Sequence, residues 1–178
     1  DGHPLLAAAS RNGQILVILG AEAGRAYVRL SPDERDSLVL IELGHECLGV
    51  HTGEAMGDEG GRTLGFARFR LGAAAPTDLV EIVRQPATPA ADVAAARALF
   101  EAHGLKTAVC SDTPGRILDR LIRPYYNAAL SRLDAGLATA ADLDLTLKLG
   151  LGYPEGPIEL LERTGLAHHH DVTLALYK

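Results

Sequence analysis

Histidine and cysteine are the first candidates for chemistry in this sequence, because both side chains bind metals and carry protons near neutral pH. The consecutive histidines of His168–His170 suggest a metal site. Three consecutive residues of a helix point in different directions, however, and the i,i+4 spacing of a helical zinc pair is absent. His45 and His51 flank Cys47 among glycines. We therefore expect no metal site, and we expect His45 and His51 to be loop or core residues.

A glycine-containing turn follows the first apolar run, at the place where a dinucleotide-binding domain holds the pyrophosphate. The fingerprint of such domains is G-x-G-x-x-G after a strand, because its glycines let the backbone approach the phosphates at a helix N-terminus. Here the turn reads Gly20-Ala-Glu-Ala-Gly24, so the middle glycine is replaced by alanine or glutamate. Glu22 would also place a negative charge where the phosphates lie. The sequence predicts that this chain by itself binds no NAD.

Four arginines in the second half recur at helical spacing: Arg116, Arg120, Arg123 and Arg132. Such a stripe could meet the phosphates of a ligand or an acidic partner helix. A solvated charged face is the simpler interpretation, and we expect it here.

The composition is that of a folded protein with one domain or two small ones. The chain has 178 residues, of which 47% are apolar, and a net charge of −6. With no basic surplus to neutralise phosphates, nucleic-acid binding is not expected. No apolar run approaches the length of a membrane span. Cys47 and Cys110 lack metal or redox spacing and no secretory segment precedes them, so we expect reduced thiols in a cytoplasmic protein. Because the chain opens at Asp1 rather than at a methionine, we expect a fragment.

The elements that must position these side chains change character near residue 112. In the first half, strand-like runs at 15–19, 38–41, 63–69, 79–83 and 107–110 alternate with turns, a short helix capped by Ser31 and an amphipathic helix over 89–103. Alternating strands and helices predict a parallel α/β sheet.

From residue 112 onward the periodicity is helical. The patterns predict a helix over 116–135, a second that begins at Thr139 and stops at Gly150, a third from Pro157 that carries Leu166, and a last one through Tyr177. The domains are therefore expected at 1–111 and 112–178.

Three blocks in this helical half carry a family resemblance. They read DTPGRILDRLIRPYYNAAL over 112–130, DLD over 142–144 and LGLGYPEGPIELL over 149–161. In order and spacing they resemble the C-terminal domain of 3-hydroxyacyl-CoA dehydrogenases, and the likeness extends over 107–177. The run Asp78–Arg84 and the segment up to Cys110 are similar to the end of the family's Rossmann domain. Residues 1–76 look like the reduced Rossmann domain between two helical domains in long bacterial members, including those of phenylacetate breakdown. The resemblance thus implies a reduced Rossmann-like α/β domain followed by an all-α C-terminal domain.

The resemblance also implies a catalytic pair, a histidine general base oriented by a glutamate, with NAD beside the 3-hydroxyl of the substrate. Glu81 falls on the glutamate position. The histidine belongs about a dozen residues upstream, in a motif of the His-Phe-Phe-Asn-Pro kind, but 65–71 contains none and Ala67 or Phe69 takes its place. Asp119 stands where the family has an asparagine near the reacting centre. Glu81 and Asp119 are the candidate catalytic residues; a strand glutamate at a sheet edge or facing a partner domain, and a surface aspartate, are the alternatives.

The function implied by the resemblance is that of an NAD-dependent (S)-3-hydroxyacyl-CoA dehydrogenase, of the 3-hydroxybutyryl-CoA kind, on short or dicarboxylic acyl-CoA in fatty-acid β-oxidation. This chain would be its C-terminal part, supplying dimerisation and a scaffold for the acyl-CoA site, while NAD and the base belong to an N-terminal Rossmann domain. Alone it is expected to be inactive. The alternatives are a non-catalytic interaction or acyl-CoA-binding module that kept the fold, and a self-sufficient enzyme with a different base near Glu81.

Overall fold

The computed structural model describes residues 15–70 and 75–177, so residues 1–14 of the expected first domain lie outside the described residues. The chain divides into two compact units. The first comprises the described residues up to Phe69 together with Pro76–Arg116, and the second is built on Ile117–Lys178. The units part five residues after the domain boundary that we expected at 111 and 112.

The first unit is built on a five-stranded sheet in the order β1-β2-β3-β4-β5. The strands are β1 (Ile15–Ile18), β2 (Leu38–Glu42), β3 (Thr63–Arg68), β4 (Leu79–Arg84) and β5 (Lys106–Ser111). All neighbouring strands are parallel except β3 and β4, which are antiparallel. The prediction of a parallel sheet is therefore wrong at one place. Only residues 69–78 join these two strands, which is too short for the crossover of a dozen or more residues that a parallel pair needs.

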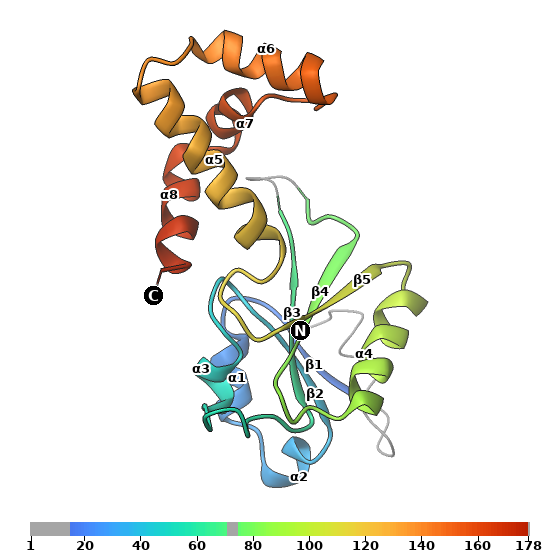
Figure 1. Cartoon of the computed structure of the whole chain (residues 1–178). Coiled ribbons are helices and arrows are strands. Elements are labelled where there is room, and N and C mark those ends of the chain that lie inside the picture. Colours follow the sequence, from blue (N-terminus) through green and yellow to red (C-terminus); the bar gives the residue numbers. More distant parts are fainter. Residues whose placement is uncertain (1–14, 71–74, 178) are drawn as a thin grey trace. The chain divides into compact units, whose positions relative to one another are not determined.

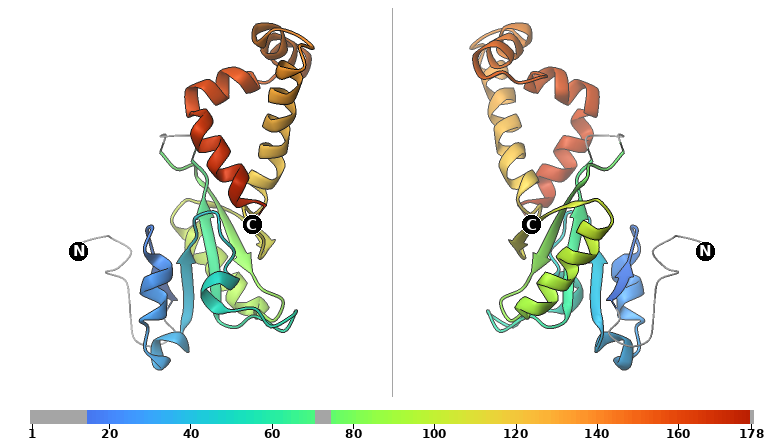
Figure 2. Two further views of the ribbon diagram at one scale, coloured as in Figure 1. Left: turned by 90° about the vertical axis from the view of Figure 1, so that its left-hand side faces the viewer. Right: turned by 90° about the vertical axis from the view of Figure 1, so that its right-hand side faces the viewer.

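Helices cover both faces of this sheet, as Figures 1 and 2 show. On one face, α4 (Ala90–Ala102) packs its Phe100 against Phe66 of β3, with ring centroids 5.0 Å apart. On the other face, Tyr27 of α1 (Ala23–Val28) packs with Val39 and Ile41 of β2. Both faces of the strands are therefore buried, which explains why the strands read as continuous apolar runs in the sequence.

Two short helices complete the first unit. The helix α2 (Pro32–Arg35) begins as predicted: the Ser31 hydroxyl accepts from the Glu34 N–H, and the Glu34 carboxylate accepts from the Ser31 N–H at 2.8 Å. The helix α3 (Gly49–Thr52), which was not predicted, follows β2 on the same face as α1.

The second unit consists of α5 (Leu118–Asp134), α6 (Ala140–Leu151), α7 (Pro157–Thr164) and α8 (Leu166–Ala175). Its first helix begins later than predicted, because Gly115 and Arg116 have φ of 71° and 53° and cannot belong to a right-handed helix. Thr139 caps α6 as expected, accepting from the Asp142 N–H at 3.2 Å. The predicted stop at Gly150 is wrong: α6 continues to Leu151 and is capped by Gly152, which has the left-handed φ of 71° that favours glycine after a helix.

The Asp144 carboxylate of α6 determines where α7 begins. It accepts from the backbone N–H groups of Ile158 and Glu159, both at 2.9 Å, and so satisfies two donors that a helix start leaves without partners. Leu166, expected on the third helix, instead opens α8 after Gly165. In the described part of the chain, no helix combines the length and apolar character needed to cross a membrane.

Candidate functional site

Glu81 lies in the interior of the sheet, because β4 is hydrogen-bonded on both sides, to β3 and to β5. The residue is only 5% exposed. In the antiparallel register, the residue directly opposite Glu81 is Ala67, and such partners have Cβ atoms within about 4.5–5.5 Å of each other. Of the two positions considered for the missing imidazole, Ala67 is therefore the one beside Glu81. Its methyl group cannot accept a proton.

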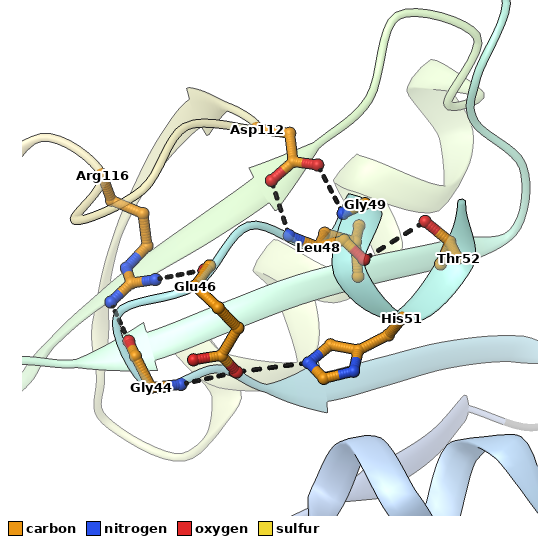
Figure 3. A network of polar contacts seen from close by, with 8 residues as sticks. All are labelled: Gly44, Glu46, Leu48, Gly49, His51, Thr52, Asp112 and Arg116. Carbon is orange, nitrogen blue, oxygen red and sulfur yellow. Dashed lines mark hydrogen bonds and ion pairs between the residues drawn. The ribbon is translucent and has the colours of Figure 1, made fainter. Parts of the chain in front are cut away.

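The charged partner of Glu81 is Arg116. Its Nε atom lies 3.8 Å from Oε2 of Glu81, and both side chains are almost fully buried. The guanidinium group also donates to the carbonyl oxygens of Gly44 and Glu46 (Figure 3). Arg116 was expected on an exposed helical face, and this prediction is wrong, because the left-handed turn at Gly115 and Arg116 directs it back into the first unit.

The chemistry of this pair differs from that of a histidine–glutamate pair. A guanidinium group stays protonated at all ordinary pH values and has no acceptor atom. The Arg116–Glu81 pair therefore cannot take a proton from a substrate hydroxyl. It can neutralise a buried carboxylate and fix the 44–46 backbone, which is a structural role.

Asp112 holds the N-terminal end of α3 on the same face of the sheet. Its two carboxylate oxygens accept from the backbone N–H groups of Leu48 at 2.7 Å and Gly49 at 2.8 Å (Figure 3). The side-chain amide of Gln85 donates to the same carboxylate at 3.2 Å. The N–H groups that might have received an anionic ligand here are therefore occupied by a residue of the chain itself.

A second histidine–glutamate contact lies beside this network. His51 Nε2 is 3.2 Å from Glu46 Oε1, and the same oxygen accepts from the Gly44 N–H at 3.1 Å (Figure 3). Burial opposes the charge of Glu46, but the backbone N–H groups of Glu46 and Gly44 and then the His51 ring together lower its pKa. The ring of His51 packs so closely on Gly24 that a Cβ there would collide with it. His51 is thus a packed residue between α1 and α3.

Cys110 faces the same side of the sheet. Burial, and then the negative charge of Glu81, raise the pKa of its thiol to about 11. A thiol with this pKa is protonated at neutral pH and is a poor nucleophile.

The turn after β1 is engaged internally as well. The Gly20 N–H donates to Glu42 Oε2 at 2.6 Å, so this N–H is engaged by a carboxylate from the end of β2. The close contact with His51 gives a packing reason for Gly24, the second glycine of the turn. The helix that follows, α1, has six residues, and the side chain of its N-cap residue Glu22 makes no capping hydrogen bond.

The sheet also lacks the topological feature at which open α/β sheets bind nucleotides. That crevice forms where the strand order reverses, whereas the described strands follow one another in sequence order, with β1 at an edge. A polar cavity of ≈ 380 Å³ lies elsewhere in the first unit, over Thr52–Ala55, Asp58–Gly61 and Gln85. Its lining includes Glu54, Asp58 and Glu59 and no lysine or arginine, so it does not suit a pyrophosphate.

Asp119 belongs to the second unit and is buried rather than on the surface, with 6% exposure. It accepts from Arg123 Nε at 2.9 Å, one turn along α5. Arg123 in turn donates to His169 Nδ1 at 3.3 Å, and His169 Nε2 lies 2.8 Å from Asn127 Oδ1. The solvated arginine stripe is therefore wrong for Arg123 as it is for Arg116.

The three histidines of α8 separate as their helical positions require. His169 is buried at 3%, whereas His168 and His170 are exposed. Across 15–70 and 75–177, no group of three or more histidine, cysteine, aspartate or glutamate side chains is placed to hold a metal ion.

Sequence reasoning missed three residues that organise these sites: Arg116, Glu42 and His169. The Pro-Gly dipeptide before Arg116 signals a turn, and this was the one available sign that Arg116 precedes the helix. Glu42 directly follows an apolar strand, which places it at the carboxyl end of the sheet. Nothing in the triple histidine distinguishes His169 from its neighbours until α8 is placed on α5.

Comparison with known proteins assigns the helical unit first. Residues 115–178 match the family model described as 3-hydroxyacyl-CoA dehydrogenase, C-terminal domain. The human protein named hydroxyacyl-coenzyme A dehydrogenase, mitochondrial, is 40% identical over 88 residues, 49% of this chain and 28% of that protein. The 3-hydroxyadipyl-CoA dehydrogenase of Escherichia coli is 35% identical over 99 residues, 56% of this chain and 21% of that protein. The matches thus span less than a third of these relatives.

Solved structures extend the likeness to the first unit. The 3-hydroxybutyryl-CoA dehydrogenase of Escherichia coli superposes on 92% of this chain and 34% of its own with a TM-score of 0.72 and 27% identity. The (S)-3-hydroxybutyryl-CoA dehydrogenase of Ralstonia eutropha covers 92% of this chain and 58% of its own, with a TM-score of 0.72. At 22% identity, the latter shows the fold alone. The helical unit of this chain is thus similar to the C-terminal domain of the 3-hydroxyacyl-CoA dehydrogenase family.

Proposed function

We propose that this chain is the C-terminal part of an NAD-dependent (S)-3-hydroxyacyl-CoA dehydrogenase, in which it serves as scaffold and dimerisation module. In the whole enzyme, hydride would pass from the 3-hydroxyl carbon of a short or dicarboxylic acyl-CoA to NAD, while a base takes the hydroxyl proton. Both NAD and base would come from an N-terminal Rossmann domain. The observation that carries the proposal is that Glu81 is buried against Arg116, which cannot accept a proton, and lies opposite Ala67 rather than a histidine.

The turn after β1 supports the cofactor part of the proposal. Before a pyrophosphate could approach Gly20, the Glu42 carboxylate would have to leave the Gly20 N–H, and Glu22 would remain as a further negative charge. No residue of this turn offers a positive charge except Arg25, which is already paired with Glu22 at 3.0 Å. We therefore infer that this chain binds NAD poorly or not at all.

The dimerisation part rests on α6. None of its residues is buried, although it carries leucines at Leu145, Leu149 and Leu151 that are 52%, 78% and 64% exposed. An apolar helix without a buried face contributes little hydrophobic stabilisation unless another surface covers it. We infer that a second copy of the chain covers this surface.

The groove beside α6 has the features of a two-fold interface. It has a volume of ≈ 410 Å³ between α5 and α6, is mostly apolar, and carries Arg132 and Asp142 at its margins. Opposite charges on one surface suit a two-fold dimer, because each can face the other across the axis. The hydroxyl group of Tyr125, which also lines the groove, is buried without a hydrogen-bond partner among the described residues.

A non-catalytic module that kept the fold is the second candidate, and the same Arg116–Glu81 pair favours it. Titration calorimetry of the purified chain separates an acyl-CoA site, in the dehydrogenase scaffold or in an acyl-CoA-binding module, from a purely structural part. The first two predict heat on addition of acetoacetyl-CoA and none on addition of NADH. Binding of neither compound would favour a purely structural or protein-binding role, and tight binding of NADH would contradict both.

Two finer expectations remain predictions. The first is a cytoplasmic location, which the comparisons do not support because the human relative is named as mitochondrial. A role in fatty-acid β-oxidation is the other, since the relatives include enzymes named for 3-hydroxybutyryl-CoA and for 3-hydroxyadipyl-CoA.

A further inference from the structure

A cluster of polar side chains joins α8 to α5 in the helical unit. It consists of His169 on α8 and of Asp119, Arg123 and Asn127 on α5. Only His169 and Val172 of α8 are buried, so His169 is one of two residues that anchor this helix. Its ring contacts three residues within about one turn of α5: Arg123 Nη1 at 3.3 Å, Asn127 Oδ1 at 2.8 Å, and the Tyr126 ring, edge to face, at 5.8 Å between centroids.

The partners fix which nitrogen of His169 carries the proton. Arg123 is donor only, so Nδ1 must accept, and Nε2–H then donates to the Asn127 carbonyl oxygen. Both polar atoms of the neutral ring are satisfied. A second proton would bind at Nδ1, where it would remove the hydrogen bond from Arg123 and place two positive charges side by side in a buried site.

The surroundings of His169 set its pKa. Burial first, and then the Arg123 cation and the neighbouring His168 and His170, lower the pKa of His169 from 6.5, while Asp119 opposes this shift. The helix α7 also packs against α8, but its charged residues do not offset the lowering of this pKa. Glu159 is paired with Lys148, Arg163 is paired with Glu155, and Glu162 is exposed. Asp171 of α8 is exposed beside His170.

We propose that His169 is an acid-sensitive latch: in its neutral form it holds α8 on α5, and its protonation releases α8. The folded chain binds this proton less readily than the unlatched chain. The α5–α8 contact therefore has its highest stability above pH 6.5. Its stability falls as the pH decreases from 6.5 to the lower pKa that His169 has in the latched state. Over that window, the equilibrium constant for opening rises by up to about tenfold per pH unit.

Amide hydrogen exchange of the whole chain tests the latch, with rates over 166–175 compared at about pH 7.5 and about pH 5.5 after correction for intrinsic exchange. The wild-type chain is expected to lose protection in α8 at the lower pH by more than threefold. In His169→Gln, whose neutral amide offers one acceptor and one donor, this loss should be absent. The matched control is His170→Gln, an exposed histidine on the same helix, which should behave as the wild type.

Persistence of the pH-dependent loss in His169→Gln would overturn the proposal. If that variant does not fold, the ring of His169 can be titrated in the wild-type chain by NMR. A titration midpoint below 6.5, accompanied by exchange broadening or loss of α8 signals, supports the latch. A midpoint at or above 6.5, or a titration that leaves α8 unchanged, contradicts it.

Discussion

Arg116 is the residue that argues most clearly against a proton-transfer site at Glu81. It neutralises Glu81 inside the sheet and ties the backbone at Gly44 and Glu46. A buried charge that loses its partner costs far more than the pair contributes when intact. The side chain is therefore expected to matter for stability rather than for proton transfer.

Replacing Arg116 by methionine is predicted to lower the free energy of unfolding by about 3–5 kcal/mol, because Glu81 would be left charged and buried. The double variant Arg116→Met/Glu81→Gln should recover much of this loss. Urea unfolding measures both. The control is Arg25→Met, which breaks an exposed pair with Glu22 and should cost no more than about 1 kcal/mol. A cost at Arg116 as small as that of the control would contradict the structural role.

Gly24 offers a second test at the scale of single residues. Its packing against the His51 ring leaves no room for a Cβ, so Gly24→Ala is predicted to destabilise the first unit by about 1–3 kcal/mol. Adding His51→Ala should relieve the clash, and the double variant should be no less stable than His51→Ala alone. If the alanine at position 24 costs the same in both backgrounds, the glycine is required for another reason.

The candidate residues could be located from the sequence, but their partners could not. Glu81 and Asp119 were chosen from the order and spacing of motifs along the chain, and their catalytic roles stay predictions. That Glu81 faces Ala67 and pairs with Arg116 depends on strand register and on a left-handed turn. Strand register arises from contacts between segments far apart in the chain, which local periodicity does not contain. The turn has a local sign in its Pro-Gly dipeptide, but that sign does not say which side chain Arg116 will meet.

At the scale of elements, α6 shows how two nearby glycines play different roles. Gly150 lies inside the helix with nothing near its missing side chain, whereas Gly152 ends the helix at φ 71°. Gly150→Ala is predicted to stabilise the chain by about 0.5–1 kcal/mol, since glycine is a poor helix former. Gly152→Ala is predicted to destabilise it by about 1–2 kcal/mol, because an L-residue is strained there. Thermal unfolding followed by circular dichroism should give Tm shifts of opposite sign; shifts of the same sign would show that the helix boundary is misplaced.

Elements with a strong local signal were predicted well. The Ser31 and Thr139 caps, the Pro157 start and all five strands follow from residue patterns. The antiparallel pairing of β3 with β4 was missed, because a parallel pattern was assumed from the alternation of elements. The short helices α1 and α3 were missed too, since their lengths of six and four residues leave almost no periodicity.

At the scale of the whole molecule, self-association should depend on α6. Leu149 is 78% exposed in the single chain, so Leu149→Asp is expected to change the stability of a monomer by less than about 0.5 kcal/mol. Light scattering after gel filtration is predicted to give twice the chain mass for the wild type and the chain mass for the variant. Val50→Asp, an equally polar change at a residue of α3 that is 69% exposed, should leave the dimer intact. A wild-type monomer, or a dimer that survives Leu149→Asp, would contradict the proposed interface.

The whole chain thus combines a helical unit similar to the C-terminal domain of 3-hydroxyacyl-CoA dehydrogenases with a sheet unit in which Glu42 engages the Gly20 N–H and Arg116 pairs with Glu81. An alcohol cannot be oxidised by NAD without a bound dinucleotide and a proton acceptor. The most direct measurement is acetoacetyl-CoA-dependent oxidation of NADH by the purified chain, followed by absorbance, with a complete family member as positive control. The predicted result is no turnover above the rate without protein. Steady turnover, abolished by a substitution at Glu81, would contradict the assignment of cofactor and base to another domain.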